Sequence, residues 1–538
     1  MFTSKPSFLV PVVSSALFAL AAACGSSSPS SSSPSPSPSP SPDSGADGPD
    51  GSLGSDDGSS SDPEPDGGTK PDTGGAPGEG PQLLVQGDVV LRGMTTDEHV
   101  IYTRKTIDGQ ALEAVSVEDG TITTIWDGLS ADASLDVKGN AVAIWTDVGT
   151  DTGLGSFSYW VPGRPTQRKV AHLSPRETFW ATTDGALIAF EANASLADGV
   201  PTSAELVVVS TATGALTPVL TDAERVAFDA CGGYFGFAGD SLVAAYCPPD
   251  ATTAKLVTVP KVAQPARQVL VDGGLRPMWK ADATGSKIFV LSDEGDEGRI
   301  VSNDGTLPAP WVAVEKGVQD PFMLRDGSAV VYRTGTTLRR APIGTPGPIV
   351  PVSIVNGDVR GILDVSLDQT RILYHALDGI PVDTQFPDGE RYFDVRAIAT
   401  DATDGAPNVL VDTERALPLS LTGSGGHALY FSKSPKLVAA ATDGSGDRSM
   451  PLDFNGMDVA PSGSHAILSV NSRPLDGHVV VDLVHVDFSK NGAEAGSPMT
   501  KPIAQSIGSA GFRFASKNRL VYVHLAAKGQ GLYRVDLP

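Results

Sequence analysis

The chain has 538 residues, which is enough for several ordinary domains or for one large repeat fold. Its 63 acidic and 39 basic residues give a formal net charge of −24 at pH 7. Because nucleic-acid binding needs clustered Lys and Arg, this charge argues against a nucleic-acid partner. An acidic surface also repels anionic lipid, so attachment to a membrane has to come from something other than charge.

The first 23 residues have the composition of a secretory signal peptide. Lys5 precedes an apolar run over residues 8–20, and three alanines lead into Cys24. The run is too short to span a bilayer as a mature helix. Leu20-Ala-Ala-Ala-Cys24-Gly resembles the lipobox of bacterial lipoproteins, in which Leu usually stands one residue later.

The resemblance to a lipobox implies cleavage before Cys24 and a lipid on its thiol. It further implies a cell-envelope location, most simply the outer membrane, at its periplasmic face or at the cell surface. The alternative is an ordinary signal peptide that is cut near Ala23, with no role for Cys24.

Residues 24–81 join the predicted lipid site to the rest of the chain. Ser-Pro repeats fill residues 26–42, and Asp, Gly, Ser and Pro dominate residues 43–80. Such a composition has too little apolar surface to form a core, so we expect a disordered tether. The tether would let the following body stand away from the membrane.

Residues 82–538 repeat a short pattern, in which a turn of Gly, Asp or Asn precedes an apolar run that often ends in an aromatic residue. With the segment 231–247 there are ten copies at a mean period of about 45 residues. The other nine copies lie at residues 95–102, 137–145, 182–190, 282–290, 325–332, 366–374, 423–430, 461–468 and 516–522. A second strand–turn–strand unit follows many copies, most clearly at 206–220.

Two hairpins per period are typical of a β-propeller blade. We therefore expect an all-β fold, a β-propeller of four-stranded blades with about 7–10 repeats, in one ring or in two smaller ones. Residues 82–91 are expected to add a strand that closes the ring with the last blade. An array of β-sandwiches is the structural alternative.

The repeats resemble the TolB-like, WD-like repeats of bacterial periplasmic propellers. In that family a Ser-Pro-Asp-Gly turn precedes the apolar strand, and Ser366-Leu-Asp-Gln and Pro461-Ser-Gly-Ser are degraded versions of it. Because the shared residues are common ones, the resemblance implies a fold and little about function.

Cys231 and Cys247 are the cysteines that remain after Cys24. They flank two apolar strands around a turn at Gly239, so a hairpin would place them opposite each other, as a disulfide requires. In an exported protein a disulfide is the expected state. A metal-binding pair or a reactive thiol is the alternative.

The sequence contains no nucleophile elbow, no Ser-x-x-Lys motif and no phosphate-binding loop. None of the eight histidines has metal-ligand spacing, and no cofactor is expected. Two acidic loops, residues 293–297 and 383–390, offer oxygen ligands of the kind that calcium prefers, with a solvated loop as the alternative.

The insertion over residues 376–392 is longer than the other loops. Long loops on rigid scaffolds often carry binding residues, so we expect a binding surface at Phe386, Asp388 and Arg391. Together these features predict a lipid-anchored envelope protein that binds or organises an unknown envelope protein or glycan without catalysis. The alternative is a propeller enzyme that acts on glycans or lactones in its central channel, with or without a metal.

Overall fold

The computed structural model of the chain describes residues 81–537 with internal gaps. The gaps are residues 108, 177, 199, 250, 263–264, 304–311, 344–348, 358, 377–392, 416–417, 422–425, 432–436, 444–446, 450–453, 461–464, 476–477, 488–503, 516–518 and 526–529. The described residues form 38 β-strands and one α-helix, and no helix among them is long and apolar enough to cross a membrane.

Six antiparallel sheets contain four strands each, in chain order, and each sheet is one blade. Blade 1 is β2 (Val89–Met94), β3 (His99–Thr106), β4 (Gly109–Ser116) and β5 (Ile122–Leu129); blade 2 is β6 (Ser134–Lys138), β7 (Ala141–Thr146), β8 (Leu154–Trp160) and β9 (Gln167–Pro175); blade 3 is β10 (Phe179–Ala181), β11 (Leu187–Ala197), β12 (Val200–Ser210) and β13 (Leu216–Leu220). Blade 6 is β21 (Val318–Met323), β22 (Ala329–Thr334), β23 (Thr337–Pro342) and β24 (Val352–Val355); blade 7 is β25 (Val359–Val365), β26 (Arg371–Ala376), β27 (Phe393–Ala399) and β28 (Val409–Arg415); blade 8 is β29 (Pro418–Leu421), β30 (His427–Phe431), β31 (Leu437–Ala441) and β32 (Asp447–Ser449).

Two seven-stranded sheets each contain two blades that share one long strand. The first consists of β14 (Tyr234–Ala238), β15 (Ser241–Tyr246), β16 (Ala254–Pro260), the shared β17 (Gln268–Ala281), β18 (Lys287–Ser292), β19 (Gly298–Ser302) and β20 (Val312–Ala313), which make blades 4 and 5. The second consists of β33 (Phe454–Val459), β34 (His465–Leu475), β35 (His478–Asp487), the shared β36 (Ala504–Ala515), β37 (Arg519–His524), β38 (Gly531–Asp536) and β1 (Gln82–Gln86), which make blades 9 and 10. The first half of β17 pairs with β16 and its last residues pair with β18, so one strand is the outer edge of blade 4 and the inner edge of blade 5.

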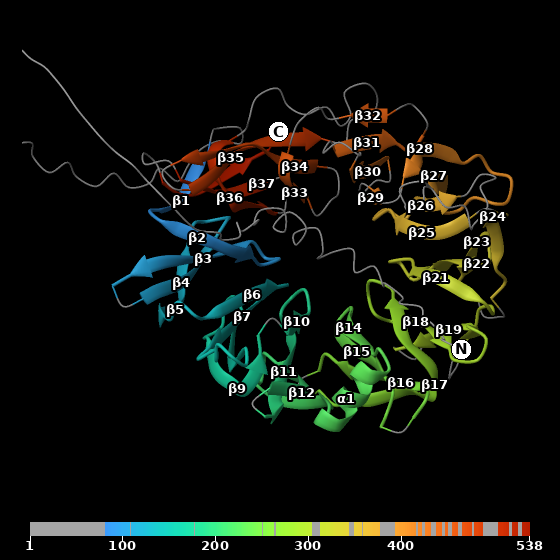
Figure 1. The fold of residues 1–538 in the computed structure, drawn as a ribbon, viewed down its shortest axis with the longest axis horizontal. Helices are drawn as coiled ribbons and strands as arrows, with labels where there is room; N and C mark the ends of the chain where they lie inside the picture. Colours follow the sequence, from blue (N-terminus) through green and yellow to red (C-terminus); the bar gives the residue numbers. More distant parts are fainter. Residues whose placement is uncertain are drawn as a thin grey trace, which may run out of the picture. The chain divides into compact units, whose positions relative to one another are not determined.

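The ten blades follow one another around a single ring (Figure 1). The first and the last described strands close this ring, because β1 pairs antiparallel with β38 as the outermost strand of blade 10. On the inner side, β2 of blade 1 contacts β36 and β37 of blade 10. The expected ring-closing strand is therefore present, and the ten sequence copies correspond to ten blades in one ring.

The hydrophobic core lies between neighbouring blades. On β7, Ala143 and Trp145 pack against blade 3, whereas Val142 and Ile144 pack against blade 1. Because both faces of blade 2 are covered in this way, its second strand β7 is buried along its length. This explains why the sequence pattern is a continuous apolar run instead of an alternation of apolar and polar residues.

In several blades the turn before the apolar run is fixed by a hydroxyl group and a carboxylate. The hydroxyl donates to the carboxylate two residues later and accepts the backbone N–H that opens the next strand. This arrangement occurs at Thr95 with Asp97 (2.6 Å), at Thr182 with Asp184 (2.8 Å) and at Ser366 with Asp368 (2.7 Å). In blade 5 the order is reversed, since Thr284 donates to Asp282 at 2.7 Å.

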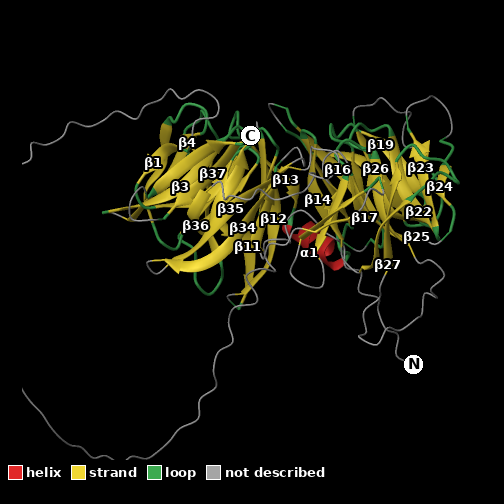
Figure 2. Cartoon of the chain, turned by 90° about the horizontal axis from the view of Figure 1, so that it is seen from above, coloured by secondary structure: helices red, strands yellow, loops and turns green. Residues whose placement is uncertain are grey.

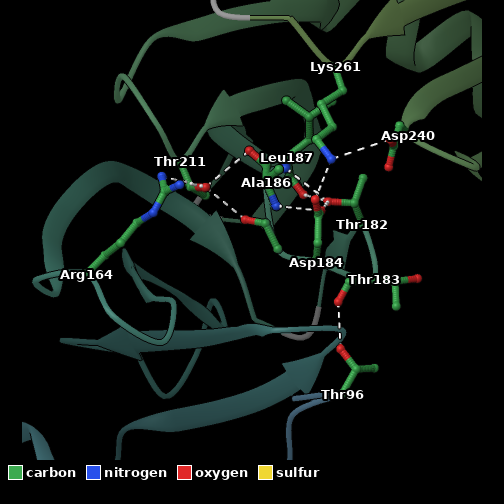
Figure 3. A network of polar contacts seen from close by, with 11 residues as sticks. Thr96, Arg164, Thr182, Thr183, Asp184, Ala186, Leu187, Thr211, Asp240 and Lys261 are labelled. Carbon is green, nitrogen blue, oxygen red and sulfur yellow. Dashed lines mark hydrogen bonds and ion pairs between the residues drawn. The ribbon is translucent and has the colours of Figure 1, made fainter.

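These turns also bind one another across blades (Figure 3). Thr96 of blade 1 donates to the carbonyl of Thr183 in blade 3 at 2.7 Å. Lys261, which follows β16 in blade 4, forms ion pairs with Asp184 of blade 3 and with Asp240 of its own blade. The turns therefore link several blades into one network at one end of the ring.

The helix α1 (Asp222–Ala230) lies between the last strand of blade 3 and the first strand of blade 4, and Figure 2 shows it beside the strands. Thr221 and Glu224 cap its first turn reciprocally. Glu224 also accepts two hydrogen bonds of 2.9 Å from Arg267 and one of 2.9 Å from Tyr246. These contacts fix the helix against blade 4.

Cys231 and Cys247 form a disulfide, with their Cα atoms 6.2 Å apart. The expectation that both stand opposite each other on a hairpin is wrong, because Cys231 is the C-cap of α1. The hairpin β14–β15 pairs Ala238 with Ser241, so its register is shifted by one residue from the expected one. The disulfide therefore joins the helix to the end of β15.

Candidate functional site

One residue of each blade occupies the same register position on the innermost strand. Each of these residues is paired with the third residue of the second strand of its blade. We call this set of innermost-strand residues the inner layer. Its members are Gly93, Asp136, Trp180, Gly236, Lys280, Phe322, Asp364, Ser420, Asp458 and Arg513. Five of the ten are ionisable, which is unusual for positions beside buried strands.

A cavity of about 370 Å³ opens where the first two blades meet the last two. It lies between the innermost strands of blades 9, 10, 1 and 2, and we call it the seam pocket. Its lining consists of Arg92, Gly93, Met94, Asp136, Val137, Asp458, Arg513 and Phe514. Four of these residues belong to the inner layer, so this part of the layer faces the inside of the ring.

Arg92 is the exposed cation of the seam pocket. Its Nε donates to the hydroxyl of Thr103 on the neighbouring strand at 3.1 Å, which fixes the plane of the guanidinium. Within the described part of the chain, its two terminal NH2 groups make no hydrogen bond. A fixed guanidinium with two unused NH2 groups is suited to bind a carboxylate with two parallel hydrogen bonds.

The two carboxylates of the seam pocket are held by the backbone. Asp136 Oδ1 accepts the N–H of Val137 at 2.8 Å, and its Oδ2 lies 3.3 Å from Lys138 Nζ. Asp458 Oδ2 accepts the N–H of Phe514 from the neighbouring blade at 3.1 Å. Both are half-buried, so each carboxylate keeps contact with solvent in the pocket.

The inner strands of blades 3 to 5 carry aromatic residues instead. Trp180 lies edge-on to Phe235, with their ring centres 4.4 Å apart. Tyr234 is 43% exposed and lies 5.4 Å from the ring of Trp279. Gly236 has no side chain to occupy the space beside Trp279, so the indole lies against the strand at that point.

Lys280 follows Trp279 on the inner edge of blade 5. Its side chain is exposed, but the surrounding protein desolvates the amine and lowers its pKa. Among the described residues no carboxylate forms an ion pair with it. The amine is therefore an uncompensated cation inside the ring, which an anionic ligand would stabilise.

No family model matches this chain, and no curated protein matches it. Several solved structures are similar. A eukaryotic initiation factor is 13% identical, covers 78% of this chain and 88% of its own, and has a TM-score of 0.37. A prolyl endopeptidase is 14% identical over 73% of this chain and 53% of its own, at a TM-score of 0.33. An oligogalacturonate lyase in complex with manganese is 14% identical over 55% of this chain and 82% of its own, at a TM-score of 0.30.

The predicted binding residues Phe386, Asp388 and Arg391 lie outside the described residues, as does Cys24. The same is true of the acidic loop over residues 383–390. The binding surface at this insertion and the lipid on Cys24 therefore stay predictions.

The acidic loop after β18 lies on the surface. Asp296 pairs with Arg276, and Glu297 pairs with Arg299 at 2.9 Å. Two of the carboxylates are therefore already compensated by arginine, whereas Asp293 is exposed. Within the described ranges, no three His, Cys, Asp or Glu side chains gather closely enough to hold a metal ion.

The residues of the seam pocket were not predicted as a site. A signal for some of them exists in the sequence, because an isolated Asp precedes the turn at three copies of the repeat. These are Leu135-Asp136-Val137, Leu363-Asp364-Val365 and Met457-Asp458-Val459. A charged residue that recurs inside an apolar strand at the same position points to a surface shared by the repeats.

Proposed function

We propose that this chain is a TolB-like, lipid-anchored envelope protein that binds an acidic glycan in the seam pocket without converting it. The signal peptide and the lipobox around Cys24 support the envelope location. The repeats that resemble those of periplasmic propellers support the same location. The ligand is inferred from the chemistry of the pocket.

The exposed guanidinium of Arg92 carries this proposal. It is oriented by Thr103 and lies in a cavity of about 370 Å³. Arg513 extends from the other side of the same seam, and Lys138 lies beside Asp136. In a chain with a net charge of −24, the two arginines that line the pocket balance its two aspartates, so the lining is neutral and Arg92 can bind an anionic group there.

The two aspartates favour a glycan over a simple anion. Asp136 and Asp458 would repel a second acidic group, but their oxygens accept hydrogen bonds from hydroxyl groups. A sugar acid carries one carboxylate and several hydroxyls on one ring, so it matches arginine and aspartate together. Phe514 and Met94 supply apolar surface for the sugar ring.

Calorimetric titration of the full chain with short uronate oligosaccharides prepared from alginate tests this proposal. Wild-type protein is expected to bind, and Arg92→Gln is expected to weaken binding at least about tenfold, because it removes a charge-assisted pair of hydrogen bonds. Arg168→Gln is the matched control, since Arg168 is exposed on β9, the outermost strand of blade 2. Its affinity should equal that of the wild type.

Two results would contradict the proposal. Wild-type protein that binds no uronate oligosaccharide would exclude this ligand class. Equal weakening by Arg92→Gln and Arg168→Gln would mean that binding depends on the general surface charge and not on the pocket.

One observation favours an enzyme that acts on glycans as the second candidate. The seam pocket contains two carboxylates, and pairs of carboxylates supply the acid and base of most glycoside hydrolases. Chromatography of the same oligosaccharides after long incubation distinguishes the two functions. Product formation that disappears in both Asp136→Asn and Asp458→Asn would establish the enzyme, whereas unchanged oligosaccharide supports binding alone.

A further inference from the structure

We infer that the ligand of the seam pocket is a chain of several sugar units that extends along the aromatic residues of blades 3 and 4 toward Lys280. This inference rests on the proposed function and adds the length and the path of the ligand. The aromatic row consists of Trp180, Phe235 and Tyr234, on the inner strands β10 and β14.

Lys138 makes the seam pocket and the aromatic row continuous. Its Nζ lies 3.3 Å from Asp136 Oδ2, which lines the pocket, and 5.4 Å from the centre of the Trp180 ring in the next blade. It also donates to the carbonyl of Phe179 at 2.5 Å, which fixes its position between blades 2 and 3. A ligand bound in the pocket therefore has Trp180 as its next neighbour along the ring.

The three rings of the aromatic row are not fully buried. Trp180 and Phe235 are half-buried where they pack against the core between blades 3 and 4, and Tyr234 is 43% exposed. Half-exposed rings on successive inner strands match the apolar faces of successive sugars in a linear glycan, whose hydroxyls stay in water.

Lys280 defines the far end of the path. It lies one blade beyond Tyr234, next to Trp279, whose ring lies 5.4 Å from Tyr234. Lys280 is an exposed cation on the inner strand of blade 5, and an anionic partner would stabilise its partly desolvated amine. The two cationic ends, Arg92 and Lys280, with aromatic surface between them, indicate an acidic oligosaccharide with a carboxylate on more than one unit.

The test measures how affinity depends on ligand length, with alginate oligomers of two and of six uronate units and the full chain. Wild-type protein should bind the six-unit oligomer about tenfold more tightly than the two-unit oligomer. Trp180→Ala should bind the two-unit oligomer as the wild type does and lose most of the gain with length. Trp180→Phe keeps a ring at this position and should restore most of the gain.

Lys280→Gln is a second variant. It should leave the packing of the blades unchanged, because the Lys280 side chain is exposed. It should lower the affinity for the six-unit oligomer severalfold and leave the two-unit affinity unchanged. Lys169→Gln is the matched control, since Lys169 is exposed on the outermost strand of blade 2. Equal melting temperatures of all variants would show that the fold is retained.

The outcomes separate this inference from the proposed function. If both oligomers bind the wild type equally, the extended path is wrong and the seam pocket alone binds. A gain with length that persists in both Trp180→Ala and Lys280→Gln also overturns the path. If no oligomer of either length binds, the proposed function and this inference fail together.

Discussion

Gly239 and Gly285 lie back to back across the boundary between blades 4 and 5. A Cβ atom on Gly239 would lie 2.9 Å from the backbone nitrogen of Gly285, and a Cβ on Gly285 would lie 3.0 Å from that of Gly239. Both residues also have positive φ angles, of 54° and 71°. The turns of adjacent blades thus meet through their backbones, with no side chain between them that could move away.

We expect Gly239→Ala to destabilise the protein more than an ordinary turn substitution. Gly214→Ala is the control, because Gly214 has a φ of 71° and no atom within 4 Å of an added Cβ. The control should lose about 1 kcal/mol of unfolding free energy from left-handed strain. Gly239→Ala should lose at least about 2 kcal/mol more, because backbone has to shift. Urea unfolding measures both, and equal losses would contradict the close contact.

A charged residue introduced into the ring-closing strand β1 should destabilise the protein only where the side chain is buried. Val85 is buried at the seam between blades 10 and 1, whereas Leu83 is 41% exposed on the same strand. Val85→Asp buries an unpaired charge and should lower the unfolding free energy by roughly 3 kcal/mol. Leu83→Asp should change it by less than about 1 kcal/mol. Thermal unfolding curves that coincide for the two variants would argue against closure by β1.

Glu224 should contribute stability that depends on pH. Although burial raises the pKa of its carboxyl, hydrogen bonds from Arg267, the Thr221 N–H and Tyr246 outweigh this and lower the pKa to about 2. A pKa that is lower in the folded state stabilises the protein above the ordinary pKa of 4.5, and this contribution is lost as the pH falls toward 2.

Glu224→Gln should therefore cost about 2 kcal/mol of unfolding free energy at pH 7 and much less near pH 2. Denaturant unfolding of both proteins from pH 2 to pH 7 measures the difference. Glu118→Gln, at an exposed position after β4, should show no such dependence. A difference that is constant with pH would exclude the role of the Glu224 carboxylate.

The predicted lipid on Cys24 leads to a direct test. Cells that express the protein and grow with labelled palmitate should incorporate label into the wild type and not into Cys24→Ser. The variant should also move from the membrane fraction to the soluble fraction, because two or more acyl chains are needed for stable anchoring. Ser26→Ala is a control next to the site. Labelled Cys24→Ser protein would place the lipid elsewhere or exclude the lipobox.

The fold class and the repeat could be predicted from the amino-acid sequence. The apolar runs, such as Ala141–Thr146, are continuous because each blade is covered on both faces. A strand that is buried on both faces needs apolar residues at successive positions, and this pattern is visible in the sequence. The turn residues of the repeats, such as Thr182 and Asp184, form a local hydrogen-bonded unit, so they too recur visibly. Both features depend on residues that are close in the chain.

The number of blades in the ring and the position of the candidate site became clear from the three-dimensional arrangement of the blades. Arg92 and Arg513 are separated by most of the chain, and they meet because β1 closes the ring on β38. The inner layer likewise combines one residue from each repeat, and no local pattern specifies which of them face a common cavity. Closure of the ring depends on the sum of small rotations between many blades. Neither the number of blades nor the set of residues that line the pocket can therefore be predicted from any single repeat.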